Sequence, residues 1–495
     1  MDNYRLIKHS GQVFTPDFIV EQMLDFCGYM YSEILRKHLI DNSCGDGAFL
    51  CLAVERYCRT FLENCNNKIQ LKKELEKYFH GIELDNVAFK NCLYNLNETV
   101  KPFGIQEVKW DIQHADALTI DEYDNKMDFV VGNPPYVRVH NLAENYERVK
   151  KFIFANGGMT DLYLVFFELG FRMMKRDGKL CYITPSSWLS SLAATNMRKY
   201  ITVNRKLIGL IDLEHFQAFE GATTYTLISY FDNKNSNDNV AYYIYEEDKK
   251  EKRFVDNLTL REMMIGNNFY ISSKSDLNLL RKIKQTHYTK LCTVKNGFAT
   301  LADQVFIGNL PFNTFTIPIL KASTGKWTKG FFPYDKNGKP IKKETIFGNE
   351  DVASYLNSCK VNLLKGKDER NKKDWYLYGR TQALKDVEAD KIAINTIIKN
   401  IDSIKLNHVP AGTGLYSGLY ILTKAPFSDI ESAIRSQEFV NYIKTLKNYK
   451  SGGYYTFNSK DLEHYLNFKL SENVEASNFA SFDEHRISQG NHKLF

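Results

Sequence analysis

Short apolar runs alternate with amphipathic stretches along the first half of this 495-residue chain. Apolar runs bounded by turn residues are typical of buried strands, and apolar positions spaced three and four apart are typical of helices. The predicted strands span residues 37–41, 79–84, 107–111, 127–132, 179–184, 206–212 and 224–232. The predicted helices span residues 17–37, 48–64, 68–78, 86–96, 161–176 and 190–203. Such alternation predicts βαβ units, so we expect an α/β domain with a mainly parallel sheet covered on both faces.

The alternation of strands and helices fades in the second half. Residues 233–237 are polar and residues 246–253 are a run of charges, which together predict a solvated connector. After about residue 265, aromatic residues, glycines and lysines are interleaved, as in 325–340, which indicates an α+β region with many loops. We therefore expect one domain over 1–245, a second over 246–480 and a polar tail over 481–495.

Composition and charge narrow the class of protein. Hydrophobic residues make up 43% of the chain, too much for a disordered protein. Residues 1–250 carry a net charge of −5, whereas residues 251–495 carry +11. A basic half favours a polyanionic partner, above all nucleic acid, and a basic domain without such a partner is the alternative.

Neither a membrane span nor a secretion signal is evident. No apolar run approaches the roughly 20 residues that cross a bilayer. The first residues also lack the apolar core of a signal peptide. We therefore expect a cytoplasmic protein that has no membrane partner.

The nine cysteines include four, at 44, 51, 58 and 65, that recur every seven residues. This spacing lacks the close pairs of a zinc site. Seven residues make two helical turns, so the spacing suits small buried thiols along one helix face. We expect no metal and no disulfides.

Acidic residues follow three successive predicted strands. Asp41 precedes Gly45 and Gly47, which predict a tight turn where the backbone can approach a ligand closely. Glu83 ends the next strand and can accept hydrogen bonds from both hydroxyls of a ribose. Asp116 follows a third strand and can accept a hydrogen bond from the amino group of an adenine. Ligands of such sheets bind beyond the carboxyl ends of the strands, so the three acids predict a nucleoside site.

The sequence Asn133-Pro134-Pro135-Tyr136 directly follows the predicted strand 127–132. Two prolines make a rigid extended turn. The Asn133 side-chain oxygen and the Pro134 carbonyl can accept the two hydrogens of an aromatic amine, which localises its lone pair on nitrogen. Tyr136 can stack on a flat base. The motif therefore predicts methyl transfer to an amino group through positioning and electrostatics.

These motifs together resemble those of the N6-adenine DNA methyltransferases of the TaqI type, which use S-adenosylmethionine. The resemblance covers most of residues 10–235, with Asn42 where that family usually has proline. It implies a Rossmann-like methyltransferase domain followed by an α+β target-recognition domain. It also implies that the target adenine is flipped out of duplex DNA.

The resemblance also implies roles for individual residues. Catalysis is assigned to Asn133, Pro134, Pro135 and Tyr136. Stacking on the target base is assigned to Tyr136 and Phe219, with Phe216 as the second choice for the latter. Cofactor contacts are assigned to Val13, Thr15, Pro16, Asp41, Cys44, Gly45, Gly47, Glu83, Asp116, Ala117, Asn133 and Phe166.

The second half resembles the specificity domain of the same family, most clearly at 294–308, 319–323, 375–382 and 414–422. Lysine and arginine bind phosphates, while side chains in the major groove select the sequence. Arg380 and Gln382, next to Tyr376 and Tyr378, have suitable chemistry, although a surface strand with solvated charges is the alternative. The residues expected to bind DNA are Lys365, Lys367, Lys372, Lys373, Arg380 and Gln382.

The expected function is thus site-specific methylation of adenine N6 in duplex DNA by a monomer, within a restriction–modification or related defence system. A separate restriction endonuclease is the expected protein partner. Two alternatives keep the same catalytic motif, namely methylation of a protein glutamine and methylation of RNA. A third is a DNA-binding relative without activity.

Overall fold

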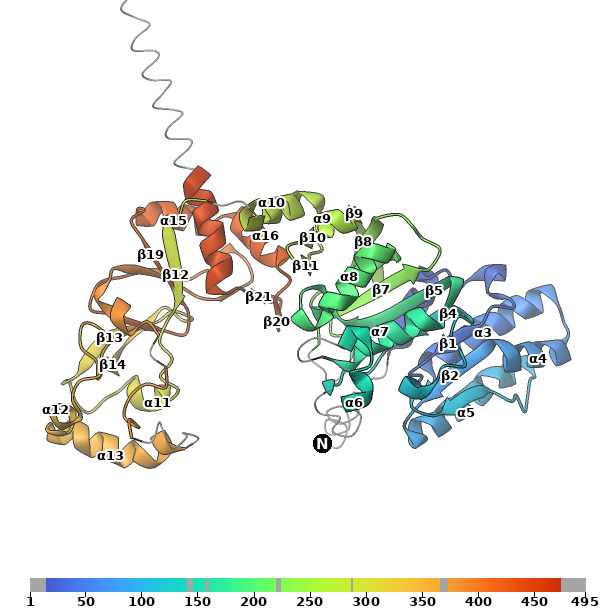
Figure 1. The fold of residues 1–495 in the computed structure, drawn as a ribbon, viewed down its shortest axis with the longest axis horizontal. Coiled ribbons are helices and arrows are strands. Elements are labelled where there is room, and N and C mark those ends of the chain that lie inside the picture. The colour runs from blue at the N-terminus through green and yellow to red at the C-terminus, as the bar shows by residue number, and fades with distance from the viewer. Residues whose placement is uncertain are drawn as a thin grey trace, which may run out of the picture. The chain divides into compact units, whose positions relative to one another are not determined.

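The structure is a computed structural model that describes residues 15–139, 146–155, 160–219, 224–285, 288–365, 373–380 and 382–472. It divides into two compact units, Met1–Asn278 and Leu279–Phe495 (Figure 1). The expected domain boundary at residue 245 falls within strand β8 (Asn239–Glu246), which belongs to the large sheet of the first unit.

A nine-stranded sheet forms the centre of the first unit. Its order is β3 (Asp111–His114), β2 (Phe79–Glu83), β1 (Leu39–Asp41), β4 (Met127–Gly132), β5 (Met174–Pro185), β7 (Thr226–Asp232), β6 (Leu207–Asp212), β8 and β9 (Glu251–Thr259). The pairs from β3 to β5 are all parallel, and β6 is parallel to β8. Strands β7 and β9 run antiparallel to their neighbours. The expectation of an α/β fold with a mainly parallel sheet is confirmed.

Helices cover both faces of this sheet. They are α2 (Asp17–Phe26), α3 (Ala48–Asn64), α4 (Lys68–Tyr78), α5 (Asn86–Val100), α6 (Tyr146–Val149), α7 (Leu162–Met173), α8 (Thr195–Asn204), α9 (Leu260–Met263) and α10 (Lys274–Gln285). Alternate strand residues enter different cores, because successive side chains point to opposite faces. Phe129 and Val131 of β4 join the core with α2, α3 and α5, whereas Val130 joins the core with α7 and α8.

Two predicted elements of the first unit have different bounds. The helix predicted over 17–37 ends at Phe26, where Gly28 turns the chain with φ +74° and a 3-10 turn follows at Tyr31–Ile34. The strand predicted over 107–111 begins only at Asp111, opposite His80 of β2. Before that point Trp110 donates a hydrogen bond to Asn97 of α5, so the apolar residues cover a helix instead of pairing as a strand.

The charge run 246–253 does not form the solvated connector that was predicted for it. It forms the tight turn of the β8–β9 hairpin, in which Glu246 pairs with Arg253 and Lys249. The long antiparallel pairing of β8 and β9 extends the sheet instead of ending the domain.

Smaller sheets build the second unit. One joins β12 (Cys292–Asn296), β19 (Leu419–Thr423), β15 (Lys391–Ile394) and β17 (Leu406–Val409). Another joins β14 (Lys326–Phe331), β13 (Thr316–Lys321) and β18 (Gly414–Tyr416). The third joins β16 (Ile397–Ile398), β21 (Tyr454–Thr456) and β20 (Tyr449–Lys450).

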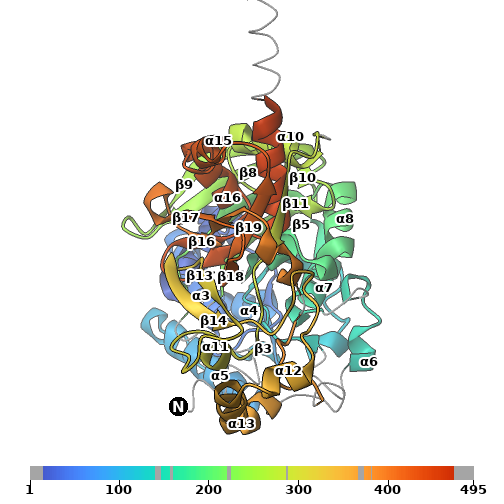
Figure 2. The same cartoon turned by 90° about the vertical axis from the view of Figure 1, so that its left-hand side faces the viewer.

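The helices of the second unit gather at its two ends. They are α11 (Asp303–Phe306), α12 (Lys343–Phe347), α13 (Glu350–Leu364), α15 (Phe427–Ile434), α16 (Gln437–Thr445) and a helix that runs from residue 459 through 472. Both ribbon views place α12 and α13 at one end and α15 at the other (Figures 1 and 2). The mixture of short sheets and helices agrees with the expected α+β region.

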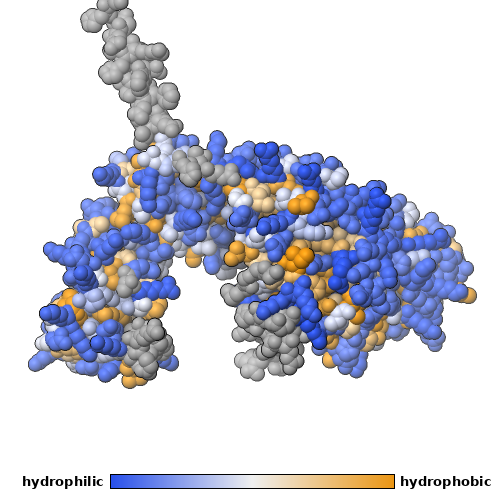
Figure 3. Space-filling model, viewed as in Figure 1, coloured by the Kyte–Doolittle hydropathy of each residue, from blue (hydrophilic) through white to orange (hydrophobic). Residues whose placement is uncertain are grey.

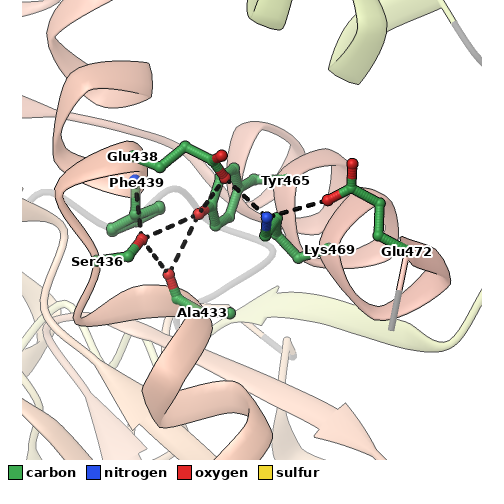
Figure 4. Close-up of polar contacts among 7 residues, drawn as sticks. All are labelled: Ala433, Ser436, Glu438, Phe439, Tyr465, Lys469 and Glu472. Carbon is green, nitrogen blue, oxygen red and sulfur yellow. Dashed lines mark hydrogen bonds and ion pairs between the residues drawn. The ribbon is translucent and has the colours of Figure 1, made fainter. Parts of the chain in front are cut away.

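A polar cluster around the buried Tyr465 joins the last described helix to α16 (Figure 4). The Tyr465 hydroxyl lies 3.2 Å from Ser436 Oγ, from the Ala433 carbonyl oxygen and from Glu438 Oε1. Lys469 forms ion pairs with Glu438 at 3.1 Å and Glu472 at 3.0 Å. This cluster positions the C-terminal helix on the segment that leads into β20.

The surface visible in Figure 3 is mostly hydrophilic on each unit, with small hydrophobic patches between the charged residues. Within the described ranges, no helix has the length and apolar character that crossing a membrane requires.

Candidate active site at the carboxyl ends of the strands

The predicted acids and the proline motif meet along one edge of the sheet. Strands β3, β2, β1 and β4 are neighbours and parallel, so their carboxyl ends lie side by side. Asp41 ends β1, Glu83 ends β2 and Asn133 follows β4. Asp116 follows β3, and the amide of Ala115 next to it donates to the Glu83 carbonyl.

The glycine turn after β1 is held by both buried acids. The Ser43 amide donates to Asp41 Oδ1 at 3.0 Å, and the Gly45 amide donates to Glu83 Oε2 at 2.8 Å. Gly45 and Gly47 have φ of +55° and +93°, which few other residues adopt easily. A side chain on Gly47 would also lie 2.9 Å from the Cys92 sulfur. Both positions therefore favour glycine through their backbone conformation, and Gly47 also through the space around it.

Asp41 is 1% exposed and Glu83 is 9% exposed. Burial raises the pKa of Asp41 to about 8, and the neighbouring Glu83 carboxylate contributes to the increase. Burial also raises the pKa of Glu83, although the amides of Asp85 and Gly45 oppose that change. Two buried acids side by side favour a ligand that brings hydrogen-bond donors and positive charge.

The turn after β4 lies directly over Asp41. A β-carbon on Gly132 would approach Asp41 Oδ1 to 2.6 Å, so only glycine fits at the last residue of β4. The Ser43 hydroxyl donates to the Asn133 carbonyl at 3.4 Å. Asn133 Nδ2 donates to Thr15 Oγ1 at 3.1 Å, which turns the amide oxygen away from Thr15.

Tyr136 is anchored at both ends of its side chain. Its hydroxyl donates to the Ile183 carbonyl of β5 at 3.1 Å. Its ring meets Phe219 edge to face at 6.0 Å between centroids, and Tyr163 at 6.4 Å. Phe219 is 3% exposed, whereas Phe216 packs against Phe18 and Tyr245. The preferred aromatic partner of Tyr136, Phe219, is thus the one that the fold places beside it.

The other residues expected to contact the cofactor have different environments. Pro16 starts α2 and Cys44 is buried in the turn after β1. Ala117 and Phe166 belong to the same hydrophobic core, in which Phe166 is 6% exposed. Asp116 caps the turn Ala117–Thr119 through the Leu118 amide, and its carboxylate lies 3.8 Å from Arg148. Val13 lies outside the described residues.

Two side chains at this edge were not predicted from the sequence. Ser43 connects the glycine turn to the proline motif through its hydroxyl. Leu84 is an apolar side chain that is 64% exposed directly after Glu83. An apolar residue left in solvent at the end of a buried strand is the signal that could have identified Leu84.

The structure describes four of the six residues expected to bind DNA. Lys365, Lys373 and Arg380 are exposed, and Lys367 and Lys372 lie outside the described residues. Gln382 is half-buried and donates to the Gly297 carbonyl at 2.7 Å.

The tyrosines expected beside these residues are core residues. Tyr376 and Tyr378 are 4% and 6% exposed. The Tyr378 hydroxyl donates to the Phe331 carbonyl. Both rings belong to the core that also contains residues of β14, α12 and α13, so neither presents its face to solvent.

Comparisons with known proteins show which families this chain resembles. Residues 49–219 match the model of the Eco57I restriction-modification methylase family. The chain is 24% identical, over 84% of its length, to the type II restriction enzyme and methyltransferase RM.Eco57I of Escherichia coli, of which it covers 52%. It is 27% identical to the type II methyltransferase M.BstVI of Geobacillus stearothermophilus over 60% of each chain. The chain therefore spans about half to three fifths of the length of these relatives.

Two solved structures share the fold. The type IIL restriction-modification enzyme MmeI, solved with DNA, has a TM-score of 0.61 at 13% identity over 92% of this chain and 64% of its own. The type ISP enzyme LlaGI, solved as a nuclease-deletion mutant with a DNA substrate mimic, has a TM-score of 0.50 at 11% identity over 93% of this chain and 54% of its own.

The homologous methyltransferases imply S-adenosylmethionine as the cofactor. The buried acids and the glycine turn fit it, since it carries two ribose hydroxyls and two positive charges. The glycine turn, the paired acids and the proline motif thus lie on one sheet edge. Glu83 and the proline motif fall within the matched segment, whereas Asp41 and the glycine turn precede it. This chain is therefore similar in sequence to type II restriction-modification methyltransferases, and its residues 49–219 match the model of the Eco57I restriction-modification methylase family.

Proposed function

We propose that this chain is a DNA methyltransferase that transfers a methyl group from S-adenosylmethionine to N6 of an adenine in duplex DNA. The observation that carries this proposal is the position of the Asn133–Tyr136 turn. It follows β4, contacts the glycine turn through Ser43 and is braced by Thr15. A rigid acceptor pair beside two buried acids suits transfer between a nucleoside cofactor and an amino group.

In the proposed reaction, the Asn133 side-chain oxygen and the Pro134 carbonyl accept the two amino hydrogens of the target base. The nitrogen lone pair then becomes available for attack. The cofactor supplies an electrophilic methyl group on its sulfonium. The nitrogen–carbon bond forms as the carbon–sulfur bond breaks, and the extra proton leaves the nitrogen for solvent. Positioning and fixed dipoles lower the barrier without a general base.

In the same proposal, Glu83, Leu84 and Asp41 bind the cofactor. Glu83 has lone pairs left for ribose hydroxyls, since a carboxylate offers about four acceptor sites and two amides use one each. The exposed Leu84 next to it offers an apolar surface for the adenine ring. Asp41 lies where a positive charge of the cofactor would be stabilised.

We also propose that the target adenine is flipped out of the duplex to reach this turn, at a cost of a few kcal/mol. Tyr136 offers a ring held by the Ile183 carbonyl, and stacking of one base contributes about 1–3 kcal/mol. Because the Phe219 ring is nearly fully buried, we assign the direct stacking to Tyr136 and the support of that ring to Phe219. Fluorescence of 2-aminopurine at the target position should rise with the wild-type protein and less with Tyr136→Ala.

The decisive assay is methyl transfer from labelled S-adenosylmethionine to genomic DNA of a strain that lacks adenine methylation. Labelled N6-methyladenine is the expected product. Labelled N4-methylcytosine, or label in RNA or protein supplied in its place, would contradict the proposal. Asn133→Ala should abolish transfer while cofactor affinity changes less than threefold, and Asn97→Ala, an amide on α5, serves as the matched control.

The relatives are named as parts of type II restriction systems. We propose a role for this chain in a restriction–modification or related defence system in the cytoplasm, as a monomer with a separate endonuclease. Sedimentation with and without DNA tests the monomer. Single-molecule sequencing of DNA from expressing cells would identify the methylated sequence.

A further inference from the structure

The small sheet β16–β21–β20 has one face in the core of the second unit and one face in solvent. Ile398, Tyr449 and Tyr455, one from each strand, are 1%, 7% and 7% exposed. Side chains alternate along a strand, so their neighbours occupy the opposite face. That outer face, which we call the ribbon face, carries Ile397, Lys399, Lys450 and Tyr454.

The ribbon face combines lysines with exposed apolar surface. Ile397 is 45% exposed and Tyr454 is 38% exposed, although both are large hydrophobic residues. Lys399 Nζ lies 5.9 Å from the centre of the Tyr454 ring and donates to the Gly452 carbonyl at 3.3 Å. The aromatic ring and the ammonium group are therefore held together before any partner arrives.

The charge around this face is mainly positive. Residues 444–460 contain four lysines and no aspartate or glutamate. No described carboxylate forms an ion pair with Lys399 or Lys450. Asp402, exposed on the turn Ile401–Ser403, is the acid nearest to Lys399 in the sequence, and Asp461 is paired with Lys284 at 3.3 Å. The ribbon face thus suits a polyanion.

The shape of the hairpin suits a groove. Gly452 and Gly453 form its turn with φ of +78° and +80°, so the tip carries almost no side-chain bulk. The major groove of B-DNA is about 12 Å wide and admits a two-stranded β-ribbon. In Figure 1 the strands β20 and β21 project beyond α16 at the edge of the second unit.

We propose that the β20–β21 hairpin, with β16 beside it, is a contact surface for duplex DNA. Lys399 and Lys450 would bind phosphates, and Tyr454 and Ile397 would face the groove. Lysine is depleted at the centres of protein–protein interfaces, so ammonium groups that no described carboxylate neutralises favour nucleic acid over a protein partner. This proposal rests on the proposed DNA methyltransferase function and adds a surface that none of the residues expected to bind DNA includes.

The test uses the full chain with Lys399→Ala and Lys450→Ala combined. Affinity for a fluorescent duplex of random sequence is measured by anisotropy across a salt series. Loss of two phosphate contacts should reduce the slope of log affinity against log salt by about 1.8 and weaken binding about tenfold or more at 0.1 M salt. Lys73→Ala with Lys109→Ala removes the same charge from exposed positions of the first unit and should change neither value.

Further variants distinguish the loss of positive charge from a loss of folding. Lys399→Arg with Lys450→Arg should restore the salt slope, and thermal unfolding should match the wild type because both side chains point outward. A double alanine variant that binds duplex with the wild-type slope, or that loses affinity only for single-stranded RNA, would overturn the proposal. A wild-type chain that methylates no DNA, with the salt slope still reduced in the double alanine variant, would contradict the proposed function and leave this surface supported.

Discussion

Asp41 is the residue whose ionisation should report cofactor binding. Its pKa of about 8 means that the free protein keeps this proton at neutral pH. The positive charges of S-adenosylmethionine should stabilise the ionised form and lower that pKa. Binding at pH 7 should therefore release a proton, and the release should disappear above about pH 9, where Asp41 is already ionised.

Calorimetry in two buffers with different ionisation enthalpies measures this release. Asp41→Asn should remove it, and S-adenosylhomocysteine, which lacks the sulfonium charge, should produce less of it. Proton uptake on binding would contradict the assignment. The same pKa also affects folding. The unfolded chain loses this proton near pH 4 and the folded chain near pH 8, so the contribution of Asp41 to stability falls as pH rises between the two values.

Substitution of Glu83 should affect both the glycine turn and cofactor binding, because its carboxylate binds the turn as well as the proposed ribose. Glu83→Ala removes the acceptor of the Gly45 and Asp85 amides. Each lost charge-assisted hydrogen bond is worth about 1.5–3 kcal/mol, so cofactor affinity should fall at least about tenfold. Glu76→Ala is the matched control, since Glu76 accepts only the Lys109 amide at the surface. An unchanged dissociation constant for Glu83→Ala would remove this acid from the site.

At the scale of elements, one buried hydroxyl contributes to holding the last described helix in place. Tyr465 is fully buried, and its hydroxyl lies within hydrogen-bond distance of three oxygens of the segment 433–438. Tyr465→Phe leaves those groups short of a partner, which costs about 1–3 kcal/mol. Urea unfolding of the full chain should show that loss, whereas Tyr454→Phe, with an exposed hydroxyl, should show almost none. Equal stability of the two variants would mean that packing alone holds the helix.

At the scale of the whole molecule, the charge asymmetry remains when the boundary moves to that of the compact units. Residues 279–495 hold 32 Lys and Arg against 21 Asp and Glu, a net charge of +11, which leaves −5 for residues 1–278. The basic unit should dominate DNA binding, with log affinity falling by about 0.9 per decade of salt for each phosphate neutralised. Removal of lysines from the second unit should flatten that slope, and removal of as many from the first unit should not. Equal effects would show that the asymmetry has no bearing on DNA.

Local patterns predicted the helices 48–64 and 68–78 and the strand 127–132 with their observed bounds, because each carries a strong apolar period and a clear stop. They were less reliable where an element depends on a distant partner. Strand β3 starts where β2 offers it a hydrogen-bonding edge, and β9 is a strand because β8 pairs with it despite the charges. A window of sequence contains no information about those partners.

The sequence by itself determined the chemistry of the candidate site, because Asp41, Glu83 and Asn133 each end a strand and adjacent parallel strands bring their ends together. Only the tertiary structure decided how these groups support one another. The Thr15 hydroxyl that orients Asn133 lies 118 residues away in the sequence, and Tyr378 became a core residue because Phe331 and Tyr334 surround it. Burial and long-range hydrogen bonds are properties of the packed chain, so composition could suggest a basic DNA-binding half, but only packing revealed which of its side chains face solvent.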